Sequence, residues 1–250
     1  MLPFVGTALG ALCVLFARRG AASRTIKVVE GFSAGVMIAA SIWSLLIPSI
    51  EFAPGEGAIT VVPAVVGFIF GMMFFLLCDA GLARYKSKHP DVGNGGALKG
   101  SLFPIIAVAV HNLPEGMAVG AIYAEVLSAE NRAAVLSAAG VLSLGIAVQN
   151  FPEGAIVSMP LHAMGMGKGK AFFMGVLSGI VEPIGALITI LAAGIAVPLL
   201  PYLLAFAAGA MVFAVFHGFT ENGDGGGGIA WMISFSLGFS LMMSLDVILG

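Results

Sequence analysis

Long apolar stretches alternate with short polar breaks from one end of the chain to the other. A helix needs ~20 mostly apolar residues to cross the hydrocarbon core of a bilayer, and stretches of about this length recur along the whole chain. We therefore predict an all-α polytopic membrane protein with eight transmembrane helices in one domain over residues 1–250. The expected spans are Leu2–Ala17, Gly31–Phe52, Ile59–Ala83, Gly100–Ala124, Ala133–Pro160, Lys170–Val197, Leu199–Phe219 and Gly228–Leu249.

The composition agrees with this pattern. Hydrophobic residues make up 59% of the chain and charged residues only 10%, whereas a soluble domain carries roughly 25% charged side chains. The chain therefore cannot form a water-soluble surface. Because Arg18 and Arg19 follow the first apolar stretch rather than precede it, we interpret this stretch as a retained helix and not as a signal peptide.

Charge and glycine positions refine the prediction. With both termini outside, the cytoplasmic loops would collect most of the basic residues, namely Arg18, Arg19, Arg24, Lys27, Arg84, Lys86, Lys88, Lys99, Lys168 and Lys170. Only Arg132 would remain outside, and this asymmetry is typical of the positive-inside rule.

Several glycines lie four residues apart, for example Gly31 with Gly35 and Gly116 with Gly120, which predicts close helix packing.

Two related motifs stand in the fourth and fifth expected spans. HNLPEG begins at His111 and QNFPEG begins at Gln149, and they share Asn, Pro, Glu and Gly at identical offsets. Since residues four apart lie on one helical face, His111 and Glu115 face the same way, with Asn112 beside them. Consecutive spans run antiparallel, so a pseudo-twofold axis could relate the two motifs.

Prolines and a third carboxylate extend the constellation. Pro114 and Pro152 precede the motif glutamates, and we expect both helices to kink there and to line an interior path. Glu182 of the sixth span likewise stands beside a proline, Pro183. At ~1.5 Å per residue the three clusters reach the same membrane depth, so we expect them to meet.

The chemistry of these side chains favours a metal ion. A carboxylate near the membrane centre is costly unless it is paired, protonated or metal-bound, and no lysine or arginine is expected at that depth. One imidazole, three carboxylates and amide oxygens suit zinc, iron, manganese or cadmium better than copper(I) or magnesium. One buried His or Glu alone would be explained equally well by a hydrogen bond to a neighbouring helix, but three clusters together favour a metal site.

At these residues the sequence resembles the ZIP (Zrt-, Irt-like protein) family of divalent metal transporters, most closely its short bacterial branch. The resemblance covers nearly the whole chain and is carried by HNLPEGMAVG, QNFPEGAIVSMPL, SGIVEPIGA, AGVMIAASIWSLLIPSIE and GFSLMMSLDVILG. It implies a ZIP-like bundle of eight helices with both termini outside, a paired metal site between the fourth, fifth and sixth helices, and homodimers.

The resemblance also implies roles for individual residues. The expected ligands of one metal position are His111, Glu115, Gln149, Glu153 and Glu182. Those of its neighbour are Asn112, Asn150, Glu153 and Glu182, so that two glutamates would bridge. The sequence departs from the family at Asn150, where many relatives carry Asp or His, and in the seventh helix. There His217 and Glu221 would replace part of a glutamate-rich segment and contribute to the transport pathway.

We therefore expect a transporter and not an enzyme, moving zinc or another divalent transition metal into the cytoplasm across the cell membrane, the inner membrane in a Gram-negative bacterium. We expect the lipid bilayer and a second copy as partners, and no organic cofactor or nucleic acid. A proton-coupled carrier that uses the glutamates as a relay is the alternative. An intramembrane metalloprotease is a remote one, because its HExxH motif needs a second histidine that this helix lacks.

Overall fold

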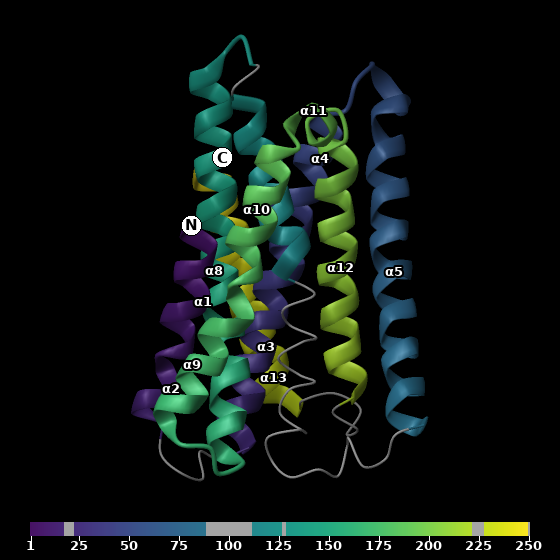
Figure 1. The fold of residues 1–250 in the computed structure, drawn as a ribbon. Coiled ribbons are helices and arrows are strands. Elements are labelled where there is room, and N and C mark those ends of the chain that lie inside the picture. The colour runs from purple at the N-terminus through teal and green to yellow at the C-terminus, as the bar shows by residue number, and fades with distance from the viewer. Residues whose placement is uncertain (18–22, 89–111, 127–128, 222–227, 250) are drawn as a thin grey trace.

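The computed structural model describes residues 1–17, 23–88, 112–126, 129–221 and 228–249. Every regular element within these ranges is helical, and the long helices run side by side in one bundle (Figure 1). The prediction of an all-α fold is therefore confirmed for the described residues. Within the described ranges, six helices are long and apolar enough to cross a membrane, namely Lys27–Glu51, Gly57–Tyr85, Arg132–Ala163, Lys168–Leu191, Leu200–Phe219 and Gly228–Ile248.

The helices follow the apolar stretches of the sequence. Their bounds are α1 Leu2–Ala11, α2 Cys13–Phe16, α3 Ser23–Ala40, α4 Ile47–Glu51, α5 Val61–Lys88, α8 Arg132–Ala163, α9 Lys168–Gly179, α10 Val181–Leu191, α11 Ala193–Ala196, α12 Leu200–Glu221 and α13 Gly228–Leu249. A π-helical turn, η1 (Ser41–Leu46), joins α3 to α4, and a 3-10 turn, η2 (Gly57–Thr60), precedes α5. A further helix covers residues 112–126. Residues 100–111 of the expected fourth span lie outside the described residues, so the count of eight spans remains a prediction.

Two expected spans are interrupted in the structure. The first, Leu2–Phe16, is a short apolar helix broken at Leu12, and at ~1.5 Å per residue its length of about 22 Å is less than the hydrocarbon thickness. The sixth is broken at Ile180, where α9 ends and α10 begins. Pro183 explains the second break, because proline has no N–H to continue the hydrogen-bond ladder and fits the first turn of a new helix.

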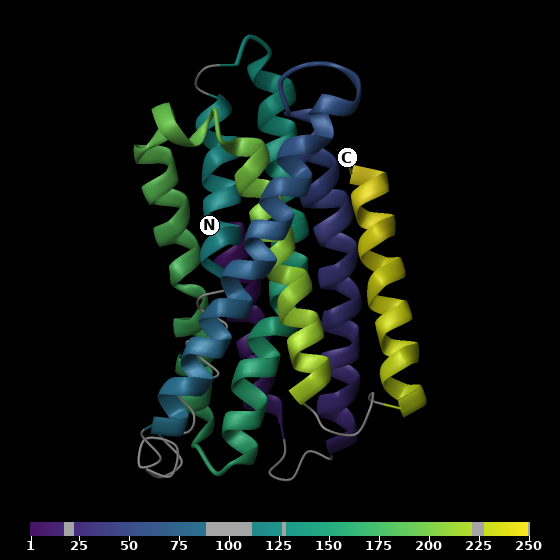
Figure 2. The same ribbon diagram turned by 90° about the vertical axis from the view of Figure 1, so that its right-hand side faces the viewer.

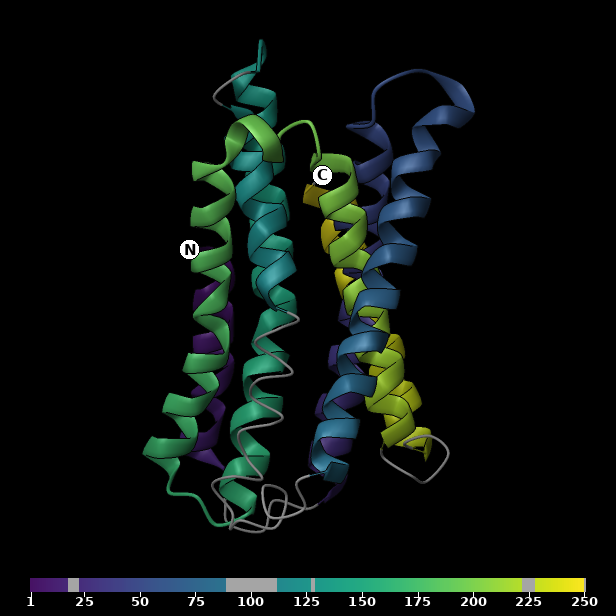
Figure 3. The same cartoon turned by 45° about the vertical axis from the view of Figure 1, so that its right-hand side comes forward.

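Glycines divide the bundle into two groups of helices. Within the first group, Gly6, Gly10 and Gly154 bring α1 and α8 into backbone contact, and Gly116 does the same for residues 112–126 and α10. In the second group the close pairs are α3 with α13 and α5 with α12, through Gly31, Gly35, Gly67, Gly71, Gly209 and Gly238. Figure 3 shows the two groups side by side. The predicted glycine-mediated packing is confirmed for these pairs. We call the group with α1, α8, α10 and residues 112–126 the site group. The group with α3, α5, α12 and α13 is called the frame group.

Buried apolar side chains pack across the boundary between the two groups. The main core cluster combines Ile122 and Ile146 of the site group with Leu45, Leu204 and Met211 of the frame group, all nearly inaccessible to solvent. The described glycine at this boundary, Gly145, meets only side-chain atoms, and none of them closer than 3.0 Å. Glycine–backbone contacts thus join helices within each group, whereas the boundary at Gly145 and in the core cluster is formed by side chains.

The outer face of α5 is apolar, and basic residues stand at both ends of the bundle. Helix α5 exposes a row of large side chains that includes Ile69, Phe70 and Leu77, as suits a surface in contact with lipid. One end of the bundle holds the end of α5 and the starts of α9 and α13 (Figure 2). Helix α8 begins at the opposite end, with Arg132 as its first residue.

Candidate functional site

Asn112 and Glu115 stand on the helix at residues 112–126, and both are buried. Asn112 Nδ2 donates a hydrogen bond to Glu182 Oε1 at 3.1 Å, so this helix is tied to α10 at the level of the motif. Gly116 lets the two backbones approach, since a Cβ there would lie 2.7 Å from Glu182 Cα. The HNLPEG motif thus combines the polar groups with the glycine that permits the contact.

Helix α8 contributes Gln149, Asn150 and Glu153, which are 0%, 0% and 8% exposed. The helix runs through Pro152 without ending, from Arg132 to Ala163. Gln149 Nε2 donates to Glu115 Oε1 at 2.8 Å, which joins the two motifs directly. The pair of motifs therefore meets as a buried polar cluster, in keeping with the expectation from their depth.

Glu182 lies in the first turn of α10, directly after the break at Ile180. This position suits a carboxylate, because the free N–H groups of a helix start carry partial positive charge. Its Oε1 accepts hydrogen bonds from Thr7 Oγ1 at 2.8 Å and from Asn112. Gly179 leaves the space this arrangement needs, since a Cβ there would lie 2.9 Å from Thr7 and 3.1 Å from Glu182 Oε1.

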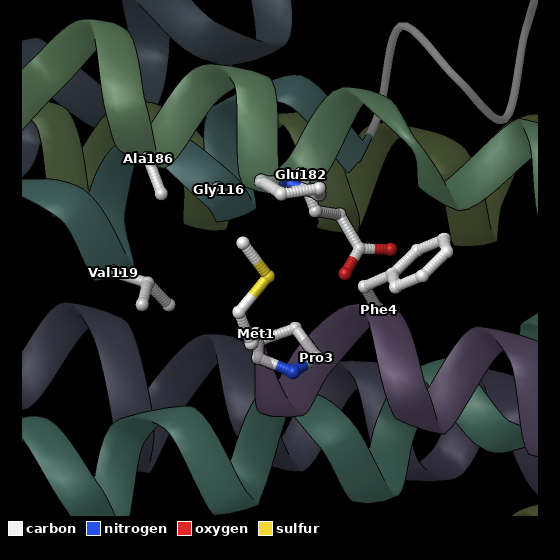
Figure 4. Close-up of a pocket in the computed structure, with 8 residues that line it drawn as sticks. Met1, Pro3, Phe4, Gly116, Val119, Glu182 and Ala186 are labelled. Atoms are coloured by element: carbon white, nitrogen blue, oxygen red, sulfur yellow. The ribbon is translucent and has the colours of Figure 1, made fainter.

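A small pocket opens beside Glu182, between α10, α1 and the helix at residues 112–126 (Figure 4). Its volume is about 10 Å³, which is the space of roughly one water molecule. The Glu182 carboxylate points into this space toward Phe4, with Gly116 beside Glu182 and with Met1, Val119 and Ala186 lining the rest of the pocket. The carboxylate is therefore held on one side by hydrogen bonds and faces a small opening on the other.

The cluster concentrates buried oxygen atoms that have no hydrogen-bond donor. Each of the six described motif residues contributes one: Asn112 Oδ1, Glu115 Oε2, Gln149 Oε1, Asn150 Oδ1, Glu153 Oε2 and Glu182 Oε2. Asn150 lies beside Glu115 and Glu182, but neither of its polar atoms completes a hydrogen bond. Since about nine in ten buried polar groups in folded proteins are paired, six unpaired acceptors in one place need a common explanation.

Electrostatics make the cluster attractive to a cation. Glu115 is close enough to Glu153 and Glu182 to feel the charge of both, and Glu153 likewise feels Glu182. The buried side chains of the described residues include no lysine or arginine that could balance these carboxylates. Among the described ranges no three His, Cys, Asp or Glu side chains are already arranged to hold a metal ion. A cation at this place would therefore draw on the Asn and Gln oxygens as well as on the carboxylates.

The remaining predicted residues lie elsewhere. His111 falls outside the described residues. His217 Nε2 contacts Asp79 Oδ1 at 3.1 Å and its ring stacks on Phe213, which places it between α12 and α5. His217 lies six positions after Met211, which is ~9 Å further along α12 than that residue of the cluster. Glu221 is the last residue of α12, and its side chain is outside the described set.

Two residues of the cluster were missed by the sequence analysis. Thr7 is fully buried and donates to Glu182, and Met211 accepts a weak hydrogen bond from Gln149 Nε2 at 3.9 Å. Thr7 could have been noticed as a polar residue between Gly6 and Gly10 in an otherwise apolar helix. Met211 has no such signal, because a methionine in an apolar span is typical of ordinary core packing.

Comparisons with known proteins agree with the motifs. The family described as ZIP Zinc transporter matches residues 97–246, which contain both motifs and Glu182. "Zinc transporter ZIP11" of Homo sapiens is 34% identical, with 98% of this chain and 94% of that protein covered. "Zinc transporter GufA" of Myxococcus xanthus is 33% identical over 100% of this chain and 97% of that protein. "Zinc transporter ZIPB" of Bordetella bronchiseptica is 34% identical, covering 99% and 79%. With its apolar helices and buried polar cluster, this chain belongs to the ZIP zinc transporter family and is a membrane transporter of metal ions, not an enzyme.

Proposed function

We propose that this protein carries divalent transition metal ions into the cytoplasm, with zinc as the main substrate and iron, manganese, cadmium or cobalt as others. The observation that supports this most directly is the set of six buried, unpaired acceptor oxygens contributed by the described residues of the two motifs and Glu182. A dication would satisfy these oxygens together and offset the repulsion between the three carboxylates. Carboxylate and amide oxygens with one imidazole suit zinc and its neighbours.

The proposed metal positions follow the motifs. One position would use Glu115, Gln149, Glu153 and Glu182 together with His111, and the neighbouring one would use Asn112, Asn150 and the two bridging glutamates. An amide carries no charge, so Asn150 would make the second position weaker than one with an Asp. The shared carboxylates would let an ion pass between the two positions without losing all its ligands at once.

The charges at the two ends of the bundle support the proposed orientation in the membrane, with which uptake toward the cytoplasm is consistent. Lys168 and Lys170 stand at the start of α9, at the opposite end from Arg132, which supports a cytoplasmic α8–α9 turn by the positive-inside rule. Both termini would then lie outside. We further propose that ions leave past His217 and Glu221, toward the same cytoplasmic end, and that the protein resides in the cell membrane, the inner one in a Gram-negative cell, as a homodimer.

The helix groups suggest how access could alternate. The described site residues other than Met211 belong to the site group, whose helices interlock through glycine–backbone contacts. The boundary with the frame group consists of side chains such as Ile146 and Leu204. A group that is rigid within itself and smooth at its boundary can shift as one body, so we favour an elevator-like or rocking movement of the site group over a channel-like pathway.

Metal uptake into proteoliposomes tests the proposal. Purified protein would be reconstituted and assayed with zinc, iron, manganese, cobalt and cadmium, beside the variants His111→Ala and Glu182→Ala. Glu56→Gln is the matched control, because Glu56 is an exposed carboxylate outside the cluster. We expect zinc uptake in the wild type and the control and its loss in both site variants. If none of the metals enters faster than into empty liposomes, the central claim fails.

A further inference from the structure

The side chain of Gln149 lies at the boundary between the two helix groups. It is fully buried on α8, and its Nε2 has two acceptors: Glu115 Oε1 at 2.8 Å and Met211 Sδ at 3.9 Å. Its Oε1 is buried and has no hydrogen-bond partner. Both described contacts of this amide are therefore made by its nitrogen.

The two partners impose one orientation on the amide. An amide can rotate by 180° and exchange its NH₂ donor with its carbonyl acceptor at little cost in shape. A metal-binding carboxylate is ionised and accepts hydrogen bonds only, and a thioether sulfur is a weak acceptor that cannot donate. A rotated amide would set its oxygen against a carboxylate oxygen and a sulfur lone pair. Glu115 and Met211 therefore both hold the nitrogen on their side and direct Gln149 Oε1 away from them.

Met211 differs from the other partners because it comes from the frame group. It is completely buried on α12. The other hydrogen bonds between described side chains of the cluster stay within the site group and join Thr7 and Asn112 to Glu182 and Gln149 to Glu115. The contact from Gln149 to Met211 crosses the boundary that would have to shift in alternating access. It exists only when the two groups are in the relative position seen here.

We propose that Met211 is a positioning residue that orients the Gln149 amide for metal binding and thereby raises the metal affinity of this conformation. The inference rests on the proposed function, because it takes Gln149 Oε1 to be a metal ligand. When the site group moves relative to the frame, the sulfur contact is lost and the amide becomes free to rotate. The transporter would then hold the ion less tightly at the point where it must release it.

Met211→Leu tests this role, because leucine keeps a similar volume and removes the acceptor. We expect the KM for zinc uptake to rise about fivefold, the equivalent of one weak hydrogen bond, with Vmax within about twofold of the wild type. Met242→Leu is the matched control: Met242 is also completely buried in the same core cluster, and no hydrogen bond joins it to the described cluster residues. Its KM should not change.

Testing Met211→Leu in the Gln149→Glu variant separates an effect on the orientation of the Gln149 amide from an effect on the packing around Met211. Glu has an acceptor oxygen in both orientations, so Gln149→Glu leaves no orientation for Met211 to select. In that background Met211→Leu should cause no further change in the KM for zinc. If Met211→Leu alone leaves KM unchanged, or if KM rises equally in both backgrounds, the inference is overturned while the proposed function stands. Absence of zinc uptake by the wild type would instead overturn the proposed function.

Discussion

Gly116 offers a direct test of the geometry of the site. A Cβ added there would lie 2.7 Å from Glu182 Cα and closer still to its carbonyl oxygen. Ordinary contact begins at about 3.4 Å, so Gly116→Ala must separate the two helices by about 0.7 Å or more. The same movement would lengthen the hydrogen bond from Asn112 Nδ2 to Glu182 Oε1 from 3.1 Å to about 3.8 Å, where it is no longer a hydrogen bond.

The expected consequences are both structural and functional. Overpacking of this kind costs about 1–3 kcal/mol of stability, and misplacing groups in an organised site by close to 1 Å reduces its efficiency by up to about 100-fold. We expect Gly116→Ala to lower the melting temperature in detergent and to raise the KM for zinc uptake by at least about fivefold. Gly140→Ala is the control, because Gly140 is also helical and no atom outside its own helix lies within 4 Å of the added Cβ. Wild-type KM and melting temperature in Gly116→Ala would refute the reasoning.

Four further outcomes are expected. Thr7→Val should raise the KM for zinc about fivefold by removing a hydrogen bond to Glu182, and Thr7→Ser should restore it; equal KM values in both would contradict the role. Glu153→Gln should reduce metal uptake more than tenfold, since it removes a proposed bridging charge, whereas unchanged uptake would favour a proton relay. Uptake should fall between pH 7 and pH 5 because protons compete for the metal ligands, and a steady rise down to pH 4 would count against the site. A disulfide between Ser44→Cys and Gly145→Cys would tie the frame group to the site group, since a Cβ added at Gly145 lies 3.1 Å from Ser44 Oγ. It should block uptake until it is reduced, and uptake that survives the cross-link would favour a channel-like pathway.

The broken and shortened helices show where sequence patterns succeed and where they stop. The length of the apolar stretches predicted an all-α membrane fold, because the pattern of apolar residues is a local property of the chain. The same pattern could not show that the sixth span breaks at Ile180, because an interior proline is compatible with a continuous helix such as α8 and with a new helix such as α10. Which of the two forms depends on the neighbours that pair the free backbone groups.

The motif residues were predictable because chemistry and helix periodicity together limit their roles. Buried Glu, Asn and Gln at fixed offsets share a helical face, and their cost in an apolar medium implies a common partner. Thr7 and Met211 were not predictable, since neither is unusual in its own helix. Their importance comes from the side chain that each meets on another helix.

The sequence by itself determined that this chain is a helical membrane protein of the ZIP family and which polar residues stand on its motif helices. These properties depend on composition, periodicity and local motifs. Only the tertiary structure decided that Glu182 is held by Thr7 and Asn112, that Gln149 reaches Met211, and that the helices form two interlocked groups. The physical reason is that such contacts depend on how closely two helices approach, and that distance is decided jointly by the glycines and side chains of both.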